Sequence, residues 1–550
     1  MDKTYSKIGA FVQNYHFEPL KIGIAIPPKV LSVMDLAQQW SMAASHQALQ
    51  DYGYPGRKLD SDRVAVIFGN ANAGENHYRS TFRILAPEYL EAMSSVPEFK
   101  NLPAAVQDSI IKGVLGKIRS DFQSITEDTM PGELSNVISG RVANIFNFTG
   151  PNYMSDAACA SSLAALQGAI DGLVDHRFDA VLTGGIDRNM GPESYIKFCK
   201  IGALSADGSR PYADGANGFV MGEGAVVFLL KRLEDAERDG DKIYAVIRGI
   251  GGSSDGKGKG ITAPNPLGQQ RAIERAWRDA GVHPELVGLI EGHGTSTRVG
   301  DVAEVTSMNA VFGSLGLRNN SVVLGSVKSN IGHLKSAAGA VGLLKSILSL
   351  HNHVLPPTVN FVKPNPNINF SNLPFRVISA SQEWTVKNGA TRYAGVSSFG
   401  FGGTNFHIVL EEYIPGLTGK SSIPTLAATN ISAAVPLPSI ESQANDTPMP
   451  VPVAQGSEVE FEKIKEYILG AVSEKTGYPV EMLDLELDME ADLGIDTVKQ
   501  AELFAAVRTH FGIPRREDLR LSDYNTLAKV VGFVRDALNT GAGQMLQPIS

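Results

Sequence analysis

Cys159 lies where a short apolar stretch of the sequence gives way to a helical pattern. The apolar positions that follow it, up to Ile170, have the spacing of an amphipathic helix, so Cys159 is predicted to lie between a strand and a helix start. Backbone N–H groups and the positive end of a helix dipole favour the thiolate, which is the nucleophilic form of cysteine. A buried structural cysteine fits the same local pattern. The pattern alone therefore leaves both interpretations open.

Two histidines accompany this cysteine, each in a glycine-bounded loop after a predicted strand. His293 lies in Glu-Gly-His-Gly-Thr-Ser-Thr, and His333 ends Lys-Ser-Asn-Ile-Gly-His. A third glycine-rich loop covers residues 399–407. In open α/β sheets the loops beyond the carboxyl ends of the strands converge on the functional site. A thiol nucleophile with two imidazoles suits acyl transfer from a thioester.

The elements that must position these loops alternate along the chain. Short apolar strands alternating with helices predict an α/β architecture. The predicted strands are 63–69, 179–185, 287–291, 322–327, 393–397 and a strand pair at 219–230, and the predicted helices are 30–52, 268–281, 301–312 and 336–350. Residues 70–150 are predicted to be largely helical, and the glycine-rich residues 251–260 to form a plain loop.

Length, composition and charge limit the classes of protein to which this chain can belong. A chain of 550 residues is expected to form two or more domains. A net charge of −9 argues against non-specific nucleic-acid binding. Only Cys159 and Cys199 are present, so no disulfide framework is predicted and a reducing compartment fits. No signal-peptide core and no run of eighteen apolar residues occurs, which predicts a cytoplasmic protein without membrane association.

The composition changes after residue 413. Residues 414–457 are rich in Pro, Ala, Ser and Thr and show no periodicity, so they are predicted to form a flexible linker. Residues 458–540 carry three apolar stripes at helical spacing, which predicts a small helical bundle.

Six motifs that follow one another in order resemble the β-ketoacyl synthase family. They are the Cys159 block, Ser205-Ala-Asp-Gly-Ser-Arg-Pro-Tyr, Gly218-Phe-Val-Met-Gly-Glu-Gly, His293-Gly-Thr-Ser-Thr, Lys328-Ser-Asn-Ile-Gly-His333 and Gly400-Phe-Gly-Gly-Thr-Asn-Phe-His407. The resemblance runs over residues 30–412. Residues 26–35 add a narrower resemblance to synthases of polyketide and polyunsaturated fatty acid systems.

The resemblance implies a thiolase-like α/β fold over residues 1–413, with duplicated βαβ halves layered α/β/α/β/α. It also implies a homodimer. Members of the family usually begin with a buried strand, and residues 1–29 show no such pattern. The N-terminal strand of this domain is therefore predicted to be missing.

The resemblance also implies a mechanism. Cys159 would hold an acyl group as a thioester, while His293 and His333 stabilise the enolate formed as carbon dioxide leaves a malonyl-type thioester. The backbone N–H groups of Cys159 and Phe401 would bind the oxyanion. Lys328 corresponds to a charged residue that orders the histidine region, although a purely structural ion-pair role is the alternative.

Other positions take roles from the same resemblance. Thr295 and Thr297 match positions that hydrogen-bond a pantetheine arm. Phe401 matches a gating residue, and its neighbour Gly402 allows the loop to move. Asp301 is expected to fix a loop rather than take part in the chemistry. No metal site is predicted.

The helical tail resembles an acyl carrier domain with four helices. In such domains 4'-phosphopantetheine is attached to a Ser that follows Leu-Gly-x-Asp, and Thr497 stands at that position here. The threonine keeps a hydroxyl, but its extra methyl crowds the nucleophile and restricts its rotamers. Two interpretations stay open: a carrier loaded at Thr497, or a docking-only domain that works with a loaded partner carrier protein.

The expected function is decarboxylative Claisen condensation, which makes the protein an acyltransferase of the 3-oxoacyl-[acyl-carrier-protein] synthase type. Its expected partners are acyl carrier domains in cis or in trans, acyl and malonyl thioesters, and other synthase subunits. The alternative is a catalytically silent docking or scaffold subunit. The absent N-terminal strand and Thr497 favour that alternative, and the intact Cys159, His293 and His333 oppose it.

Overall fold

The computed structural model describes residues 2–257, 260–386, 390–418, 457–476, 479–489, 493, 495, 497–514 and 523–542. These residues belong to two compact units. The first comprises Met1–Asp255 with Pro264–Ile423, and the second comprises Gly256–Ala263 with Pro424–Ser550. Most of the predicted linker at 414–457 lies outside the described residues.

Two sheets that repeat one strand order form the centre of the first unit. The first sheet has the order β2-β1-β3-β4 and the second β5-β12-β11-β6-β7-β9. The first sheet contains β1 (Val64–Gly69), β2 (Asn152–Ser155), β3 (Ala180–Asp187) and β4 (Gly224–Lys231), and the second contains β5 (Val246–Ser254), β6 (Val287–Glu291), β7 (Val322–Gly325), β9 (Phe375–Arg376), β11 (Tyr393–Gly400) and β12 (Thr404–Glu411). In each sheet a run of parallel strands is followed by an antiparallel one: three parallel strands precede β4 in the first sheet, and four precede β12 in the second. The fold is thus duplicated.

The two sheets differ at one edge. In the second sheet β12 pairs with β5, for example Leu410 with Ile247. In the first sheet the corresponding strand, β4, pairs only with β3 among the described residues. Residues 2–27 contribute one short 3-10 helix, η1 (Pro19–Ile22), and a single β-bridge between Ala10 and Gly222. In the described part of the chain, β4 is therefore an edge strand.

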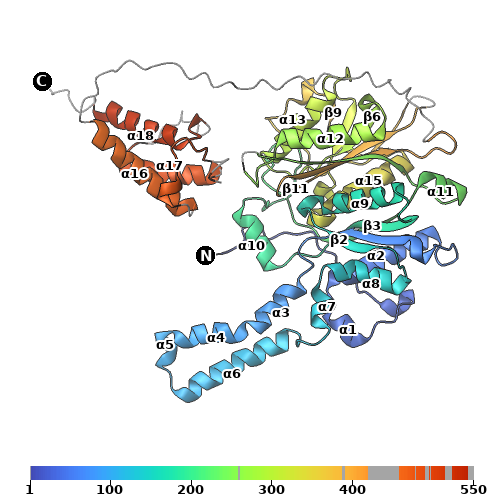
Figure 1. Ribbon diagram of the computed structural model, residues 1–550, viewed down its shortest axis with the longest axis horizontal. Helices are drawn as coiled ribbons and strands as arrows, with labels where there is room; N and C mark the ends of the chain where they lie inside the picture. Colours follow the sequence, from blue (N-terminus) through green and yellow to red (C-terminus); the bar gives the residue numbers. More distant parts are fainter. Residues whose placement is uncertain are drawn as a thin grey trace. The chain divides into compact units, whose positions relative to one another are not determined.

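Helices lie in three layers around the two sheets (Figure 1). Helices α12 and α13 cover the second sheet, α9 and α15 lie between the sheets, and α2 and α8 cover the first sheet. Their bounds are α2 (Leu36–Tyr52), α8 (Asn136–Phe146), α9 (Ser161–Val174), α12 (Pro266–Ala280), α13 (Gly300–Phe312) and α15 (Ala338–Asn352). The α/β/α/β/α layering expected from the resemblance is present.

A capping aspartate divides the helix predicted at 30–52. The structure has α1 (Pro28–Val33) and α2, separated at Met34, whose backbone is extended. The Asp35 carboxylate accepts a hydrogen bond from Ala37 N at 2.8 Å, which satisfies a free N–H at the start of α2. Its other oxygen accepts from Asn76 N at 2.9 Å and anchors the next helix.

One strand, β5, was not predicted because it contains several glycines. Strand β5 includes residues 251–254, which were predicted to be loop. A Cβ on Gly251 would lie 2.3 Å from Ala272 O of α12, so glycine is needed where the strand approaches this helix. Conversely, the strand pair predicted at 219–230 is a single strand, β4, because residues 219–223 form only isolated bridges.

An arm of helices extends from the first unit (Figure 1). It contains α3 (Asn76–Ile84), α4 (Ala86–Ser95), α5 (Pro97–Lys100) and α6 (Ala104–Asp121), and α7 (Thr129–Glu133) follows it. The prediction that residues 70–150 are largely helical is confirmed.

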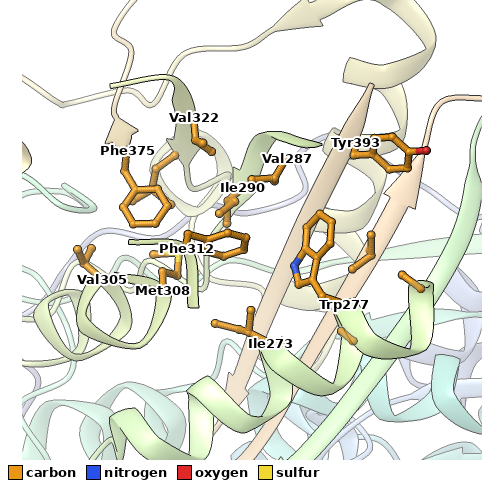
Figure 2. Packing of buried hydrophobic residues seen from close by; sticks show 14 of the residues in the cluster. Ile273, Trp277, Val287, Ile290, Val305, Met308, Phe312, Val322, Phe375 and Tyr393 are labelled. Atoms are coloured by element: carbon orange, nitrogen blue, oxygen red, sulfur yellow. The ribbon is translucent and has the colours of Figure 1, made fainter. Parts of the chain in front are cut away.

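One core cluster of the first unit joins α12 and α13 to the second sheet (Figure 2). The ring of Phe312 lies between Trp277 and Phe375, with centroid distances of 5.9 and 6.0 Å and nearly perpendicular planes. Such edge-to-face contacts add to the stabilisation from buried apolar area. This cluster holds α13 against the strands that precede the two histidine loops.

The second unit is a helical bundle around its own apolar core. It contains α16 (Ser457–Thr476), η7 (Val480–Met482), α17 (Thr497–Phe511) and α18 (Leu527–Ala542), so the three predicted stripes are helices. Its core includes Ile468, Leu503, Phe504, Val530 and Val534. Across the described ranges of both units, no helix has the length and apolar character needed to cross a membrane.

Replacing Phe312 by Ala is expected to lower the free energy of unfolding of the first unit by about 3 to 5 kcal/mol, because it leaves a cavity between two rings. Denaturant titration followed by tryptophan fluorescence measures this change, because all three tryptophans lie in the first unit. Val362→Ala is the control: this side chain is 90% exposed, so a change within about 0.5 kcal/mol is expected. Equal effects of the two substitutions would contradict the core assignment.

Candidate active site

Cys159 lies in a short 3-10 turn, η3 (Ala158–Ala160), between β2 and α9. The predicted location between a strand and a helix is confirmed. Ser161 Oγ accepts from Ala157 N at 2.9 Å and donates to Ala158 O at 2.6 Å. Ser398 Oγ of β11 donates to Cys159 O at 2.7 Å. The turn that carries the thiol is therefore held by the neighbouring Ser161 and by Ser398 of the second sheet.

Burial raises the pKa of the Cys159 thiol above its usual value. The Lys328 ammonium and the backbone N–H of Phe401 act in the opposite direction and lower this pKa, but burial has the larger effect. The thiolate stabilisation expected from a helix start is thus outweighed by desolvation. The resting group is the thiol, so deprotonation must accompany its attack.

Buried carboxylates on α13 hold the His293 loop. Glu304 accepts from His293 N at 2.6 Å and from the Tyr212 hydroxyl at 2.8 Å. Asp301 accepts from Ser296 N at 3.0 Å, and burial raises its pKa to about 7. Asp301 was expected to fix this loop. Glu304 was not expected to do so, although the i, i+3 spacing of the two residues places both on one helix face.

Backbone hydrogen bonds hold His333 on both sides. His333 N donates to Val220 O at 2.7 Å, and Gly222 N donates to His333 O at 2.9 Å. Lys335 N donates to His333 Nδ1 at 2.9 Å, so the proton of the neutral ring is on Nε2. Nε2 is buried and has no hydrogen-bond partner among the described residues. The ring thus presents an unused donor.

The two imidazoles meet edge to face with ring centroids 5.7 Å apart, and the Phe399 ring lies 5.6 Å from that of His293. Burial lowers the pKa of both histidines well below the usual value, and the charge of Lys328 lowers it further. Both rings are neutral at pH 7. They can donate a hydrogen bond to a developing anion without first losing a proton.

Lys328 is the first residue of α14 (Lys328–Ile331) and is buried. Burial lowers its pKa, while the nearby Glu291 and Glu304 carboxylates raise it. Glu291 is itself fixed, because it accepts from Val327 N at 2.5 Å and from Lys345 Nζ at 2.7 Å. The Lys328 charge lowers the pKa of Cys159 and of both histidines, so it acts electrostatically on all three reactive groups.

A three-residue loop between β11 and β12 carries Phe401, whose residue surface is 50% exposed. Gly402 has φ +101°, a conformation that favours glycine. A Cβ on Gly400 would lie 2.2 Å from Ala157 O, so the loop approaches the turn that holds Cys159. The half-exposed Phe401 therefore lies on a glycine-containing loop next to the turn that holds Cys159.

Thr295 and Thr297 lie in the loop after His293, with hydroxyl oxygens 3.1 Å apart. Gly300 N donates to Thr297 Oγ1 at 3.2 Å, which fixes that side chain. Both threonines are half-buried and keep acceptor capacity. Within the described residues, no group of three or more His, Cys, Asp or Glu is arranged to hold a metal ion.

In the second unit, α17 begins at Thr497, and the position of its side chain lies outside the description. The chain just before the helix is anchored, because Ile495 N donates to Met489 O at 2.7 Å. A hydroxyl at a helix start is the chemical group that a phosphopantetheine ester needs. The residue type therefore fits this cofactor.

Four family models match the chain. They are the β-ketoacyl synthase N-terminal domain at residues 1–236, its C-terminal domain at 244–362, the ketoacyl-synthetase C-terminal extension at 364–442 and the phosphopantetheine attachment site at 466–534. The extension overlaps most of the predicted linker. The last match indicates a covalently attached 4'-phosphopantetheine.

The chain is similar to much longer proteins. It is 37% identical over 424 residues to one subunit of the polyunsaturated fatty acid synthase of Thraustochytrium sp., which covers 75% of this chain and 15% of that protein. It is 34% identical over 440 residues to polyketide synthase PksN of Bacillus subtilis, covering 78% and 7%. The chain thus spans a small part of these relatives.

Solved structures give the same result. The ketosynthase from module 6 of the bacillaene synthase of Bacillus subtilis is 34% identical with a TM-score of 0.60, covering 73% of this chain and 62% of that one. The ketosynthase from module 1 of the Bacillus amyloliquefaciens bacillaene synthase is 28% identical with a TM-score of 0.60, covering 74% and 66%. The thiolase-like fold is confirmed.

A buried histidine beside the site gives a pH prediction. His407 Nδ1 is 2.9 Å from Ser397 Oγ, and burial lowers its pKa from 6.5 to about 3. Between these values the unfolded chain binds a proton that the folded chain does not, so stability falls as pH falls, by up to about 1.4 kcal/mol per pH unit. His407→Gln removes this contribution.

Urea titrations at pH 8, 6 and 5 measure the effect. The stability difference between the original protein and His407→Gln is expected to shrink from pH 6 to pH 5 by about 1 kcal/mol. A difference that stays constant across this range would contradict the buried, neutral state of His407.

Proposed function

The chain belongs to the β-ketoacyl synthase family over residues 1–362 and carries a phosphopantetheine-attachment domain, and from this premise we propose that it catalyses decarboxylative Claisen condensation. An acyl group held on Cys159 would react with a malonyl-type thioester to give a 3-oxoacyl thioester and carbon dioxide. The observation that carries this proposal is a buried site with a thiol, two neutral imidazoles and one ammonium.

The first step is acylation of the cysteine. Cys159 Sγ attacks the carbonyl carbon of an acyl thioester, the bond to the carrier sulfur breaks, and the thiol proton passes to the departing sulfur. The backbone N–H of Phe401 faces the Cys159 sulfur and can donate to the oxyanion formed there. The Lys328 charge favours the thiolate character that develops during attack.

The second step is decarboxylation and carbon–carbon bond formation. As the carboxylate leaves as carbon dioxide, negative charge develops on the thioester oxygen of the extender. His333 Nε2–H is a buried donor that has no other partner in the described part of the chain, and the His293 ring lies beside it. The carbanion then attacks the acyl-Cys159 carbonyl, a C–C bond forms, and the Cys159 sulfur leaves and regains a proton.

We also propose the domain bounds 1–413, 414–457 and 458–540, with Thr295 and Thr297 as contacts for a pantetheine arm. The carrier-type tail supports acyl carrier partners in cis or in trans, and phosphopantetheine supplies the thiol that carries the acyl or malonyl group. Residues 1–362 fit a transferase of the 3-oxoacyl synthase type. A homodimer is part of the proposal and rests on the family resemblance. A cytoplasmic location is also part of the proposal and rests on the sequence, whose two cysteines fit a reducing compartment. Nothing observed favours a catalytically silent role.

Loss of the nucleophile is the first test. Incubation with a short-chain acyl-pantetheine is expected to add one acyl group to the protein, detected by intact mass, and Cys159→Ala is expected to abolish this addition. Cys199→Ala is the matched control, because Cys199 is buried with its sulfur 3.0 Å from Thr4 Oγ1. An original protein that stays unmodified, or acylation that depends on Cys199, would contradict the proposed nucleophile.

Loading of the tail is the second test. With coenzyme A and a phosphopantetheinyl transferase, the protein is expected to gain one arm, more slowly than Thr497→Ser because the threonine methyl crowds the hydroxyl. Intact mass against time measures both rates, and Thr497→Ala should stay unmodified. Modification of the Ala variant, or none of the Ser variant, would exclude residue 497 as the attachment site.

A further inference from the structure

Lys335 adopts an unusual backbone conformation two residues after His333. Its φ is +47°, in the left-handed region that residues with a side chain rarely occupy. The residue begins a short 3-10 turn, η5 (Lys335–Ala337), directly before α15. In this conformation its N–H reaches His333 Nδ1 at 2.9 Å. The hydrogen bond that selects the histidine tautomer thus depends on a strained turn.

A buried ion pair holds this turn to the first sheet. Lys335 Nζ lies 2.9 Å from Asp187 Oδ1 and donates to Gly222 O at 2.7 Å. Ser336 Oγ and N donate to Asp187 Oδ2 at 2.7 and 3.2 Å. The side chains of Lys335 and Asp187 are only 8% and 1% exposed. One carboxylate at the end of β3 therefore binds two successive residues of the turn.

The condensation described above leaves this pair without a role. Removing two charges from water is unfavourable, and a buried ion pair is often no more stabilising than apolar residues of similar volume. Because a buried ion pair contributes little net stability, its role is better explained by the one local geometry that it imposes. The geometry it fixes here is the turn that follows His333.

We propose that the Lys335–Asp187 ion pair is the positioning device for His333: it holds the left-handed turn whose N–H occupies Nδ1 and so keeps the proton on Nε2, toward the extender. This assignment rests on the proposed function, because it gives His333 the role of donor in decarboxylation. Lys335 and Asp187 act through His333 and are positioning residues. The substrate class they serve is a malonyl-type thioester.

The pair also has a predictable effect on the nucleophile. Asp187 raises the pKa of the Cys159 thiol and Lys335 lowers it, and Lys328 lowers it as well. As long as both partners are present, their effects on Cys159 oppose each other. Loss of either partner alone leaves one uncompensated charge beside the thiol, and the sign of that charge differs between the two variants.

The test compares Lys335→Met, Asp187→Asn, the double variant and Lys335→Arg in the full chain, with two readouts. The first is the pH dependence of alkylation of Cys159 by iodoacetamide, measured in a Cys199→Ala background. The second is carbon dioxide release from malonyl-pantetheine, measured as kcat and KM. Arg248→Met is the control, because Arg248 forms a comparable, partly buried pair with Glu411 at 2.7 Å between β5 and β12.

The alkylation pKa is expected to rise in Lys335→Met, to fall in Asp187→Asn and to stay near the original value in the double variant. The double variant is expected to lose decarboxylation, by up to about a hundredfold in kcat with KM little changed, because His333 is no longer aligned. Lys335→Arg should recover part of this rate, and Arg248→Met should retain all of it.

Decarboxylation by the double variant at the original rate would overturn the proposal, as would shifts of the same sign in the two single variants. Failure of the proposed function gives a different result. In that case the original protein neither accepts an acyl group nor releases carbon dioxide, while the opposite alkylation shifts of the single variants still occur.

Discussion

Desolvation is the physical constraint on which this site depends. A thiol, two imidazoles, an ammonium and the carboxyl groups of Asp301 and Glu304 share one buried region, and burial disfavours the charged form of each. The same effect that makes Cys159 a thiol at rest makes both histidines neutral donors. Lys328 is the charge that moderates the effect on Cys159.

The buried carboxylates show how the fold tolerates this constraint. Glu304, Asp301 and Asp187 each accept backbone N–H groups of the loops that carry the reactive residues. A buried carboxylate is stable only when its oxygens have partners, and an N–H in a loop needs an acceptor. The carboxylate oxygens and the loop N–H groups therefore satisfy each other, and the hydrogen bonds between them set the conformation of the loops. The carboxylates thus hold in place loops that have no regular structure of their own.

The duplicated architecture explains why the reactive residues meet. Cys159 follows β2 of the first sheet, whereas His293 and His333 follow β6 and β7 of the second. The turn that holds Cys159 contacts β11, and the turn after His333 contacts β3. Each half therefore supports the residues of the other. A substitution in one sheet is expected to affect chemistry that is carried by the opposite sheet.

Sequence alone determined the α/β class, most strands and helices, and the loops of Cys159, His293 and His333, because apolar periodicity and glycine-bounded motifs are local signals. Tertiary structure decided the rest. It converted the glycine-rich residues 251–254 into a strand against α12, reversed the expected shift of the Cys159 pKa and joined Lys335 to Asp187. Burial and long-range hydrogen bonds depend on which distant segments pack together, and local patterns carry no information on that packing.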